Sequence, residues 1–548
     1  EQPTAQETGA SQTDAAQNDA AESAPAAKKT MVIGDTTFNS ENWEETVDPH
    51  RTYNGWACIR YGIGETLVHY TDSMELEPWL AKSWENDGNL TWTITLQDNV
   101  TFSSGRKMDA EAVKQCFEHL LENHDRAPGD TKIADMQADG QILTITTSEP
   151  NPALMNYLGD PYGCIIDVDA SDFDAGIVAG TGPYVVADMV TDDHLTLTKN
   201  ENYWNGTPKI DELIIRTLSN GDTLSAALQA GNIDAAYGMA YEAYPNFENG
   251  NYQFSSIQTS RAFFASMNMT SPIIQDAAVR KAIAMAVDYD TIIANAMTNQ
   301  SPSFSDVPRS LMNPTDGEQA LYDHDAVADL QWTGNDIEGA KALLDEAGIV
   351  DNDGDGWREW NGEKISLNAV CPNGWTDWQA SMEVVAAAGK NIGVEITTLY
   401  PEYSIYQTVF VDPDQTEYAI FMWSPDASTP SNPWGRVNQF MGKDYVGIAN
   451  NWSGNWGQYV NDEAEALIKK IPTTTDTAEL KDLYTKLTEI YLTEVPSFSL
   501  MYRPSVFHCV NESVWTNFPA GDDGRNIPPA DCTDGYGIAA LYELELVG

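Results

Sequence analysis

Asp426 is the residue of this chain whose setting most needs a chemical explanation. It stands in the segment FMWSPDASTPSNPWGR (421–436), between two tryptophans and among three prolines. An isolated acid in such a segment serves as a catalytic acid, a metal ligand or a partner for a bound cation. Because burying an unpaired ammonium group costs on the order of several kcal/mol, a lone acid in a closing cleft suits a cationic ligand group. The alternative is that Asp426 only caps a turn in a proline-rich loop.

A second group of acids lies in DNDGDGWREWNGE (351–363). Three alternating aspartates precede a glycine, as in the first half of a calcium-binding loop. The bidentate acid that such a loop needs would fall on Gly362, and Glu363 comes one position late, although Glu359 can contribute through water. The alternative is an acidic turn that joins a helix to the strand KISLNAV. We therefore expect no required cofactor, and a structural calcium ion is a hypothesis whose ligands are Asp351, Asp353, Asp355 and Glu359.

Tryptophan is concentrated in one part of the chain. Eight of the 16 tryptophans lie between positions 357 and 456. Large rigid rings suit an apolar pocket, and the flat faces of sugars stack on such rings while hydroxyl groups take polar partners such as Asn432, Asn438 and Asn455. The alternative is that half or more of these rings are simply buried in the core.

Length and charge restrict the class of protein. A chain of 548 residues exceeds what one hydrophobic core usually supports, so at least two lobes are expected. The net charge of −54, from 83 acidic and 29 basic residues, repels phosphate backbones, and nucleic acid is not expected as a partner. The sequence also lacks any run of about 18 apolar residues that would span a membrane.

Catalytic signatures are missing from the sequence. It contains no GxSxG, HExxH, Walker A or GxGxxG pattern, and its seven histidines do not cluster along the chain. With 83 acids, pairs of carboxylates are inevitable, so a glycosidase-like pair cannot be inferred. We therefore expect no enzyme activity. The six cysteines lack CxxC and metal-type spacing, which argues against a zinc site, while Cys509 and Cys532 either pair in an oxidising compartment or remain buried thiols.

The first 30 residues cannot build a core, because they contain no aromatic residue and no Leu, Ile or Val. They are typical of a flexible acidic tether. The chain begins with Glu1 rather than Met, so we expect a removed secretory signal and a lipid-modified cysteine ahead of Glu1, with a trimmed, disordered head as the alternative. The expected location is extracytoplasmic, on the outer face of the cell membrane or in the periplasm.

Beyond the tether, strand-like and helix-like segments alternate. LTWTITLQDNVTF (90–102) alternates like a strand, and DAEAVKQCFEHLLE (109–122) starts with an acidic cap and continues at helical spacing. QDAAVRKAIAMAVDYDTIIANAM (275–297) and IEGAKALLDEAG (337–348) predict two amphipathic helices. The sequence therefore predicts a mixed α/β fold with several sheets.

Five collinear segments resemble family 5 extracellular solute-binding proteins, the peptide, nickel and oligosaccharide receptors of ABC importers. The similarity runs from about residue 45 to the C-terminus. The segments are EPWLAKSWENDGNLTWTITLQDNVTFSSGRKMDAEAVKQCFEHLL (77–121), GTGPY (180–184), NENYWNGTPKIDELIIR (200–216), LQAGNIDAAYG (228–238) and MNMTSPIIQDAAVRKAIAMAVDYDTII (267–293).

The resemblance implies a two-lobed, periplasmic-binding-protein-like α/β fold with a hinge. It assigns residues 31–63, 181–266 and 499–548 to a discontinuous lobe I, residues 64–180 to a subdomain inserted in it, and residues 267–498 to lobe II. The two crossings between lobes are expected at 261–269 and 495–507. The implied partners are a small solute and a membrane-embedded ABC permease, and the protein is expected to be a monomer whose lobes close on the solute.

The resemblance also suggests the solute and the residues that hold it. In peptide-binding members an acid in the segment matching WSPD receives the α-amine of the ligand, which makes an oligopeptide or dipeptide the first expectation. The tryptophans and the segment MYRPSVFHCVNESVWTNFP (501–519) favour an oligosaccharide as the alternative. A nickel complex ranks third, because DPYGCII (160–166) lacks the arginine of the nickel-binding members and no histidine follows WSPD within the matching loop. The expected cleft residues are Tyr53, Trp56, Trp378, Trp423, Asp426, Trp434 and Arg436, and Arg436 either holds a ligand carboxylate or pairs with Asp426.

Overall fold

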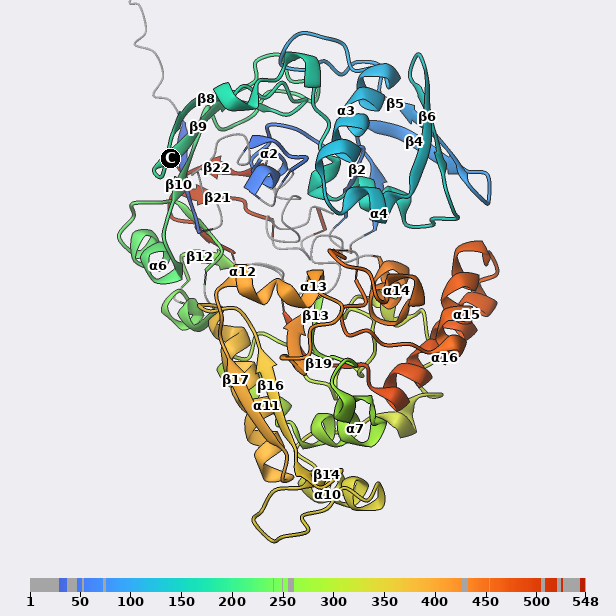
Figure 1. The fold of residues 1–548 in the computed structure, drawn as a ribbon. Helices are drawn as coiled ribbons and strands as arrows, with labels where there is room; N and C mark the ends of the chain where they lie inside the picture. The colour runs from blue at the N-terminus through green and yellow to red at the C-terminus, as the bar shows by residue number, and fades with distance from the viewer. Residues whose placement is uncertain are drawn as a thin grey trace, which may run out of the picture.

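The computed structural model divides into two lobes, one above the other in Figure 1, each built around its own β-sheet. The mixed α/β, two-lobed architecture that the sequence predicts is confirmed. None of the helices in the described part of the chain is long and apolar enough to cross a membrane. The structure describes residues 29–36, 47–51, 54–71, 75–239, 241–248, 250–254, 261–424, 432–452, 454–503, 508–519, 524–525 and 543–547.

The first lobe is organised by a seven-stranded sheet, counted over the described residues, with the order β12-β20-β11-β1-β10-β9-β8. Its central strand β1 pairs in parallel with β10 and β11, while the outer strands pair antiparallel. Segments from both ends of the chain and from its middle therefore share one sheet. The strands are β1 (Thr30–Asp35), β8 (Tyr184–Val190), β9 (His194–Lys199), β10 (Glu212–Thr217), β11 (Ala235–Tyr237), β12 (Tyr252–Phe254) and β20 (His508–Asn511), and the helix α6 (Gly221–Gln229) contacts β1 and β11.

The segment between β1 and β8 forms a subdomain around a four-stranded antiparallel sheet, which lies at the upper right in Figure 1. The predicted acidic cap of its main helix is confirmed, because the Asp109 side chain accepts a hydrogen bond from the Ala112 backbone N–H at 2.9 Å. The sheet is β4 (Ala81–Asn86), β5 (Thr91–Leu96), β7 (Ile142–Thr147) and β6 (Ile133–Asp139). The other elements are α2 (Ala57–Arg60), β2 (Val68–Tyr70), β3 (Leu76–Pro78), α3 (Ala110–Asn123), α4 (Ala127–Thr131) and α5 (Leu154–Leu158).

The GTGPY segment has a packing reason for its two glycines. A Cβ on Gly180 would lie 2.0 Å from the backbone oxygen of Ile63, and one on Gly182 would lie 2.2 Å from that of Gly62. The two backbone segments therefore approach too closely for any side chain between them, which joins the subdomain to the first lobe.

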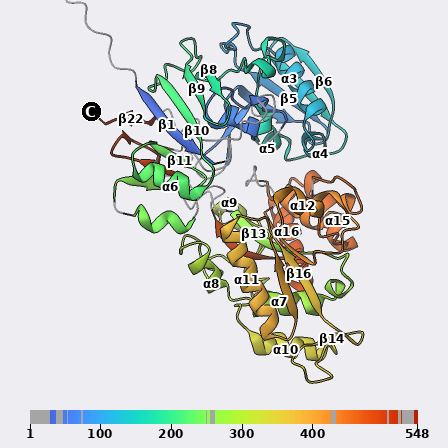
Figure 2. The ribbon, with the colours of Figure 1, turned by 60° about the vertical axis from the view of Figure 1, so that its left-hand side comes forward.

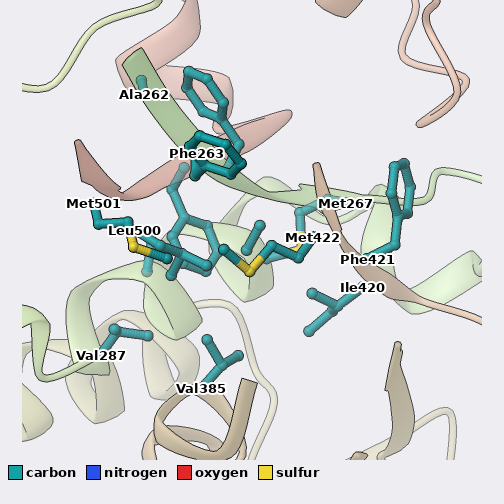
Figure 3. Close-up of a cluster of buried hydrophobic side chains, with 14 of the residues drawn as sticks. Ala262, Phe263, Met267, Val287, Val385, Ile420, Phe421, Met422, Leu500 and Met501 are labelled. Atoms are coloured by element: carbon teal, nitrogen blue, oxygen red, sulfur yellow. The ribbon is translucent and has the colours of Figure 1, made fainter. Parts of the chain in front are cut away.

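The second lobe surrounds a five-stranded sheet, again within the described ranges, with the order β17-β16-β18-β13-β19. Figure 3 shows Met267, Met422 and Met501 from three of its strands in one buried cluster with Val287 and Val385. The strands are β13 (Arg261–Met267), β16 (Ser366–Val370), β17 (Glu395–Leu399), β18 (Ile420–Trp423) and β19 (Ser497–Arg503). The helices are α7 (Ala277–Ala286), α8 (Tyr289–Asn295), α9 (Asp316–Gln319), α10 (Ile337–Glu346), α11 (Thr376–Asn391), α12 (Tyr403–Tyr406), α13 (Thr408–Val411), α14 (Pro433–Met441), α15 (Asp462–Lys470) and α16 (Thr477–Glu494), and a short hairpin is formed by β14 (Glu359–Trp360) and β15 (Glu363–Lys364). In the first lobe, the short strand β21 (Trp515–Thr516) pairs antiparallel with β22 (Glu545–Leu546).

The single helix predicted over 275–297 is two helices in the structure. Val287 ends α7 in an extended conformation, with ψ of 132°. Asp288 then caps α8, because its side chain accepts a hydrogen bond from the Thr291 backbone N–H at 3.1 Å. Periodicity alone misses this break, since the apolar spacing continues across it.

Two pairs of neighbouring strands connect the lobes. β12 pairs with β20 in the first lobe, and β13 pairs with β19 in the second. The chain therefore crosses between Phe254 and Arg261 and again between Arg503 and His508. The predicted crossing at 261–269 and the boundaries at 266 and 499 differ from this arrangement, because the buried apolar side chains of β13 and β19 pack in the core of the second lobe.

Candidate functional site

An aromatic wall lies at the end of the second lobe that faces the first. β16 and β18 run parallel, so their carboxyl ends lie at the same edge of the sheet, and open α/β sheets bind ligands at such an edge. β18 ends at Trp423, and α11 begins beside this edge with Trp378 in its first turn. Figure 1 shows α12 and α13 at the same end. We define the aromatic wall as Trp375, Trp378, Tyr403, Phe410, Trp423, Trp452 and Trp456.

The rings of the wall contact one another continuously. Trp378 packs edge to face on Trp375 and on Trp423, with centroid distances of 4.6 Å and 6.2 Å. Trp423 continues the contact to Trp456 at 4.8 Å, and Phe410 lies within 4.5 Å of both rings. The tryptophans that are concentrated in the sequence between 357 and 456 therefore include a group that is concentrated in space.

The two lobes touch on both sides of this wall. On one side the Thr376 hydroxyl donates a hydrogen bond of 2.9 Å to a carboxylate oxygen of Glu242 in the first lobe. On the other side Trp434 packs against the hydrophobic cores of both lobes, and a Cβ on Gly435 would lie 2.7 Å from the Tyr157 hydroxyl. Figure 2 shows α12 at the end of the lower lobe that faces the upper lobe. The wall therefore lies in the interlobe region.

Three buried donors in the interlobe region have no hydrogen-bond partner within the described part of the chain. They are the indole Nε1 of Trp378, the indole Nε1 of Trp423 and the side-chain Nδ2 of Asn432. Asn432 is oriented by its other amide atom, because its Oδ1 accepts a hydrogen bond from the Gly435 N–H at 2.9 Å. An unpaired buried donor costs about 1 to 3 kcal/mol, so these three groups suit hydrogen-bond acceptors of a ligand.

A buried acid and an arginine adjoin the wall, and the sequence analysis missed both. Asp377 Oδ2 lies 3.4 Å from Arg503 Nε, and the Arg503 guanidinium stacks over the Phe263 ring at 4.0 Å. Burial raises the pKa of the Asp377 carboxyl, and the charge of Arg503 opposes this effect. The position of Asp377 next to Trp378 was the only signal in the sequence.

A small cavity lies behind the wall. It has a volume of about 20 Å³, and its lining includes Ser266, Trp423, Asn455 and Trp456. This volume holds a water molecule rather than a solute. This cavity is therefore too small to be the solute site.

Comparison with known proteins identifies the fold and the family. Residues 75–445 match the bacterial extracellular solute-binding proteins, family 5 (middle region). The chain belongs to this family. As a member of it, this solute-binding protein acts outside the cytoplasm and binds a small solute for an ABC importer.

Individual relatives agree with this assignment. The solute-binding protein is 28% identical over 377 residues to the nickel-binding periplasmic protein of Escherichia coli K12. The aligned region covers 65% of this chain and 69% of that protein. It is 23% identical to the probable D,D-dipeptide-binding periplasmic protein of the same organism, over 90% of this chain and 92% of that protein. The fold matches the mannohexaose-bound periplasmic oligopeptide-binding protein of Thermotoga maritima with a TM-score of 0.76 and 23% identity, over 95% of this chain and 99% of the other.

The cleft residues predicted for the solute-binding protein have different surroundings. Trp378 and Trp423 lie together in the aromatic wall, and Trp434 lies between the lobes. Trp56 is buried in the core of the first lobe with 7% of its surface exposed. Asp426 and Tyr53 lie outside the described residues, so the expected pairing of Asp426 with Arg436 does too.

Arg436 is engaged by a carboxylate that the sequence analysis did not consider. Its Nη1 and Nη2 donate to the two carboxylate oxygens of Glu318 at 2.6 Å and 3.0 Å, and Nη1 also donates to the Leu311 backbone oxygen at 2.9 Å. The side chains of Arg436 and Glu318 are 1% and 7% exposed. The Arg436 guanidinium thus forms a buried bidentate ion pair inside the second lobe.

The acidic loop after α10 is exposed and lies beside α10 and β14, at the end of the second lobe that is turned away from the first (Figure 1). Carboxylate oxygens of Asp351, Asp353 and Glu359 lie within 4.8 Å of one another, whereas Asp355 is not part of this group. The Asp351 carboxylate accepts hydrogen bonds from the N–H groups of Gly354 and Gly356. These contacts also form a turn, so calcium binding stays a prediction.

The cysteines of the described chain are buried thiols. Cys58, Cys116, Cys164, Cys371 and Cys509 are free, and Cys532 lies outside the described residues. Of the two alternatives for Cys509, the structure therefore has the buried thiol. Burial raises the pKa of these five thiols, which makes them poor nucleophiles.

Proposed function

We propose that this receptor captures a short peptide between its two lobes and delivers it to a membrane-embedded ABC permease. The observation that carries the proposal is the set of unpaired donors in the interlobe region, Trp378 Nε1 and Trp423 Nε1 in the aromatic wall and Asn432 Nδ2 at the start of α14. A peptide offers carbonyl and carboxylate oxygens that accept such hydrogen bonds. Asp426 follows Trp423 by three residues and supplies the acid for the peptide α-amine.

Closure of the lobes is the proposed mechanism. The two crossings join strand pairs in each sheet, which suits a hinge, and contacts such as Thr376 with Glu242 bring the lobes together beside the wall. A solute that contacts both lobes binds the closed state more tightly than the open one, and that difference shifts the equilibrium. We propose further that the protein acts as a monomer, is tethered by an N-terminal lipid and returns its solute chemically unchanged.

An oligosaccharide is the second candidate solute, favoured by one specific observation. The rings of Trp375 and Tyr403 stack nearly in parallel, at 5.6 Å and 22°, and remain 37% and 39% exposed. Exposed ring faces at the end of a binding wall suit the flat faces of sugar rings. A nickel complex ranks last, because 160–166 lacks the expected arginine.

Isothermal titration of the purified protein separates these candidates. Mixed di-, tri- and tetrapeptides are titrated alongside linear hexose oligosaccharides, with the Asp426→Ala variant as a comparison. A peptide receptor binds peptides and loses about 2 to 5 kcal/mol of affinity in the variant, because the peptide ammonium then lies buried without a partner. Binding of oligosaccharides alone, or equal peptide affinity in both proteins, contradicts the peptide proposal.

A further inference from the structure

A cluster of metal-ligating side chains lies in the first lobe, apart from the aromatic wall. Asp48 and His50 belong to the short segment 47–51, and His119 lies on α3 of the inserted subdomain. One ligand atom from each of the three residues lies within 4.8 Å of the others. The seven histidines do not cluster along the sequence, yet the Nδ1 atoms of His50 and His119 are 2.8 Å apart in the structure. Positions 50 and 119 are far apart in sequence, and only folding brings them together.

The hydrogen bonds of His50 fix which nitrogen faces the cluster. Its Nε2 lies 2.9 Å from the backbone carbonyl oxygen of Cys164, which can only accept, so Nε2 carries the proton. The lone pair of Nδ1 therefore points toward His119. Metal-binding histidines are commonly oriented in this way, with the second ring nitrogen donating to a carbonyl group.

Asp48 brings a carboxylate oxygen to within 4.8 Å of a ligand nitrogen of each histidine. Its Oδ2 lies 3.7 Å from His119 Nε2, and its Oδ1 accepts a hydrogen bond from the His50 backbone N–H at 3.0 Å. Only 1% of the Asp48 side chain is exposed, so the carboxylate is held in place by the fold. Arg51 Nε lies 3.4 Å from the same Oδ2 and supplies part of the compensating charge.

We propose that Asp48, His50 and His119 bind a divalent transition metal ion of the zinc class. Two imidazoles and one carboxylate suit zinc and its neighbours, whereas calcium and magnesium prefer oxygen ligands alone. Nitrogen ligands on one tetrahedral zinc ion stand about 3.3 Å apart, so the two histidines need to separate by only about half an ångström. His119 is 18% exposed, which gives the ion a route from solvent and leaves a fourth position for water.

The metal ion would join the segment 47–51 to α3. This segment also supports the turn that carries Trp56, because a Cβ on Gly55 would lie 1.9 Å from the Asp48 backbone oxygen. Binding of the ion therefore fixes a part of the first lobe that precedes Trp56 directly. The inference concerns the chain's own ligands and does not depend on the identity of the solute.

Titration of the chelator-treated, untagged full-length protein with Co²⁺ and Zn²⁺ tests the proposal. Millimolar Mg²⁺ and Ca²⁺ are added to occupy the many surface carboxylates, and Co²⁺ gives ligand-field absorption bands that report nitrogen ligands. We expect one equivalent of tight binding and a rise in Tm with Zn²⁺. The His119→Ala variant is expected to lose at least tenfold in affinity, together with the absorption bands and the Tm shift.

The matched control is His194→Ala, which removes a histidine whose Nδ1 lies 2.9 Å from Asp193 without a second histidine in contact. It is expected to bind the metal as the unmodified protein does. If His119→Ala fails to fold, as judged by circular dichroism, His119→Gln replaces it with a partly exposed side chain of similar size. A metal carried in the interlobe cleft as cargo would still bind to either variant. Equal binding and equal absorption in the unmodified protein and the His119 variants overturn the proposal.

Discussion

The indole rings of Trp378 and Trp423 meet edge to face, with centroids 6.2 Å apart and planes at 90°. Neither Nε1 atom finds a hydrogen-bond acceptor within the described part of the chain, although both are buried. Their neighbour Trp456 differs, because its Nε1 donates to the Asn451 backbone oxygen at 2.6 Å. The wall thus combines one indole that is hydrogen-bonded within the fold with two whose donors suit a solute.

Substitution of Trp378 by Phe tests this distinction. The change keeps an aromatic ring but removes the unpaired N–H, so we expect about 1 to 3 kcal/mol weaker solute binding and little change in unfolding free energy. Trp456→Phe is the matched control and should mainly lower stability, since it leaves the Asn451 oxygen without its donor. Calorimetric titration and denaturant unfolding measure the two effects. Unchanged affinity in Trp378→Phe would show that its N–H does not contact the solute.

Glu318→Gln probes the buried ion pair with Arg436. The substitution keeps the side-chain shape but removes the charge that faces the guanidinium, and we expect a loss of about 3 kcal/mol in unfolding free energy. Glu494→Gln is the control, because its pair with Arg280 is 3.3 Å long and the Glu494 side chain is 40% exposed. That variant should lose less than about 1 kcal/mol. Unfolding in urea measures both losses. Equal losses of unfolding free energy in the two variants would contradict the difference between the buried and the exposed ion pair.

His69 predicts part of the pH dependence of stability. The ring is buried and stacks on Trp79 at 3.9 Å, and burial lowers its pKa from 6.5 to about 3. Below about pH 6.5 the unfolded chain binds a proton that the folded chain excludes, so this contribution to stability is complete at higher pH and declines as the pH falls toward 3. Between pH 7.5 and pH 5.5 the loss is about 1.4 kcal/mol.

The comparison protein for this measurement is His69→Phe, which keeps an aromatic face on Trp79. Both proteins lose unfolding free energy between pH 7.5 and pH 5.5, and the loss in His69→Phe should be smaller than that in the unmodified protein. The difference between the two losses should be about 1.4 kcal/mol. Other titrating groups contribute to both proteins and cancel in the difference. Parallel stability curves would mean that His69 takes up its proton over the same pH range in the folded and unfolded states.

Much of the fold could be predicted from the sequence, because local signals and core packing agree there. Helix α10 follows the apolar periodicity of 337–348, and the acid at Asp109 caps α3 as expected. The first crossing, predicted at 261–269, lies before Arg261 in the structure, whereas the second, predicted at 495–507, overlaps the observed crossing between Arg503 and His508. β13 and β19 read equally well as hinge strands or core strands, and only their pairing with each other and the pairing of β13 with β18 assigns them to the second lobe.

The candidate site was partly predictable for a related reason. The concentration of tryptophans indicated an aromatic surface, and Trp378 and Trp423 meet there. Contacts between residues distant in sequence were not predictable. Glu318 lies 118 positions before Arg436, and His119 lies 69 positions after His50, so no local pattern links either pair.

Calcium binding by the loop at 351–363 has its own test. If the acids there hold the ion, millimolar Ca²⁺ should raise the Tm by a few degrees and Mg²⁺ should raise it less, because the two ions differ in preferred geometry. Asp353→Ser should abolish the calcium effect, whereas Asp193→Ser, an exposed acid in another turn, should keep it. The same response to Ca²⁺ in both variants would leave the loop as a hydrogen-bonded turn.

Native mass spectrometry of the protein purified from its own cells, followed by denaturing release, tests the central claim most directly. The account predicts an adduct between the lobes that resolves on release into short peptide masses, and it predicts that Asp426→Ala purifies without them. Released masses separated by hexose units would contradict the peptide proposal and assign the aromatic wall to sugar stacking.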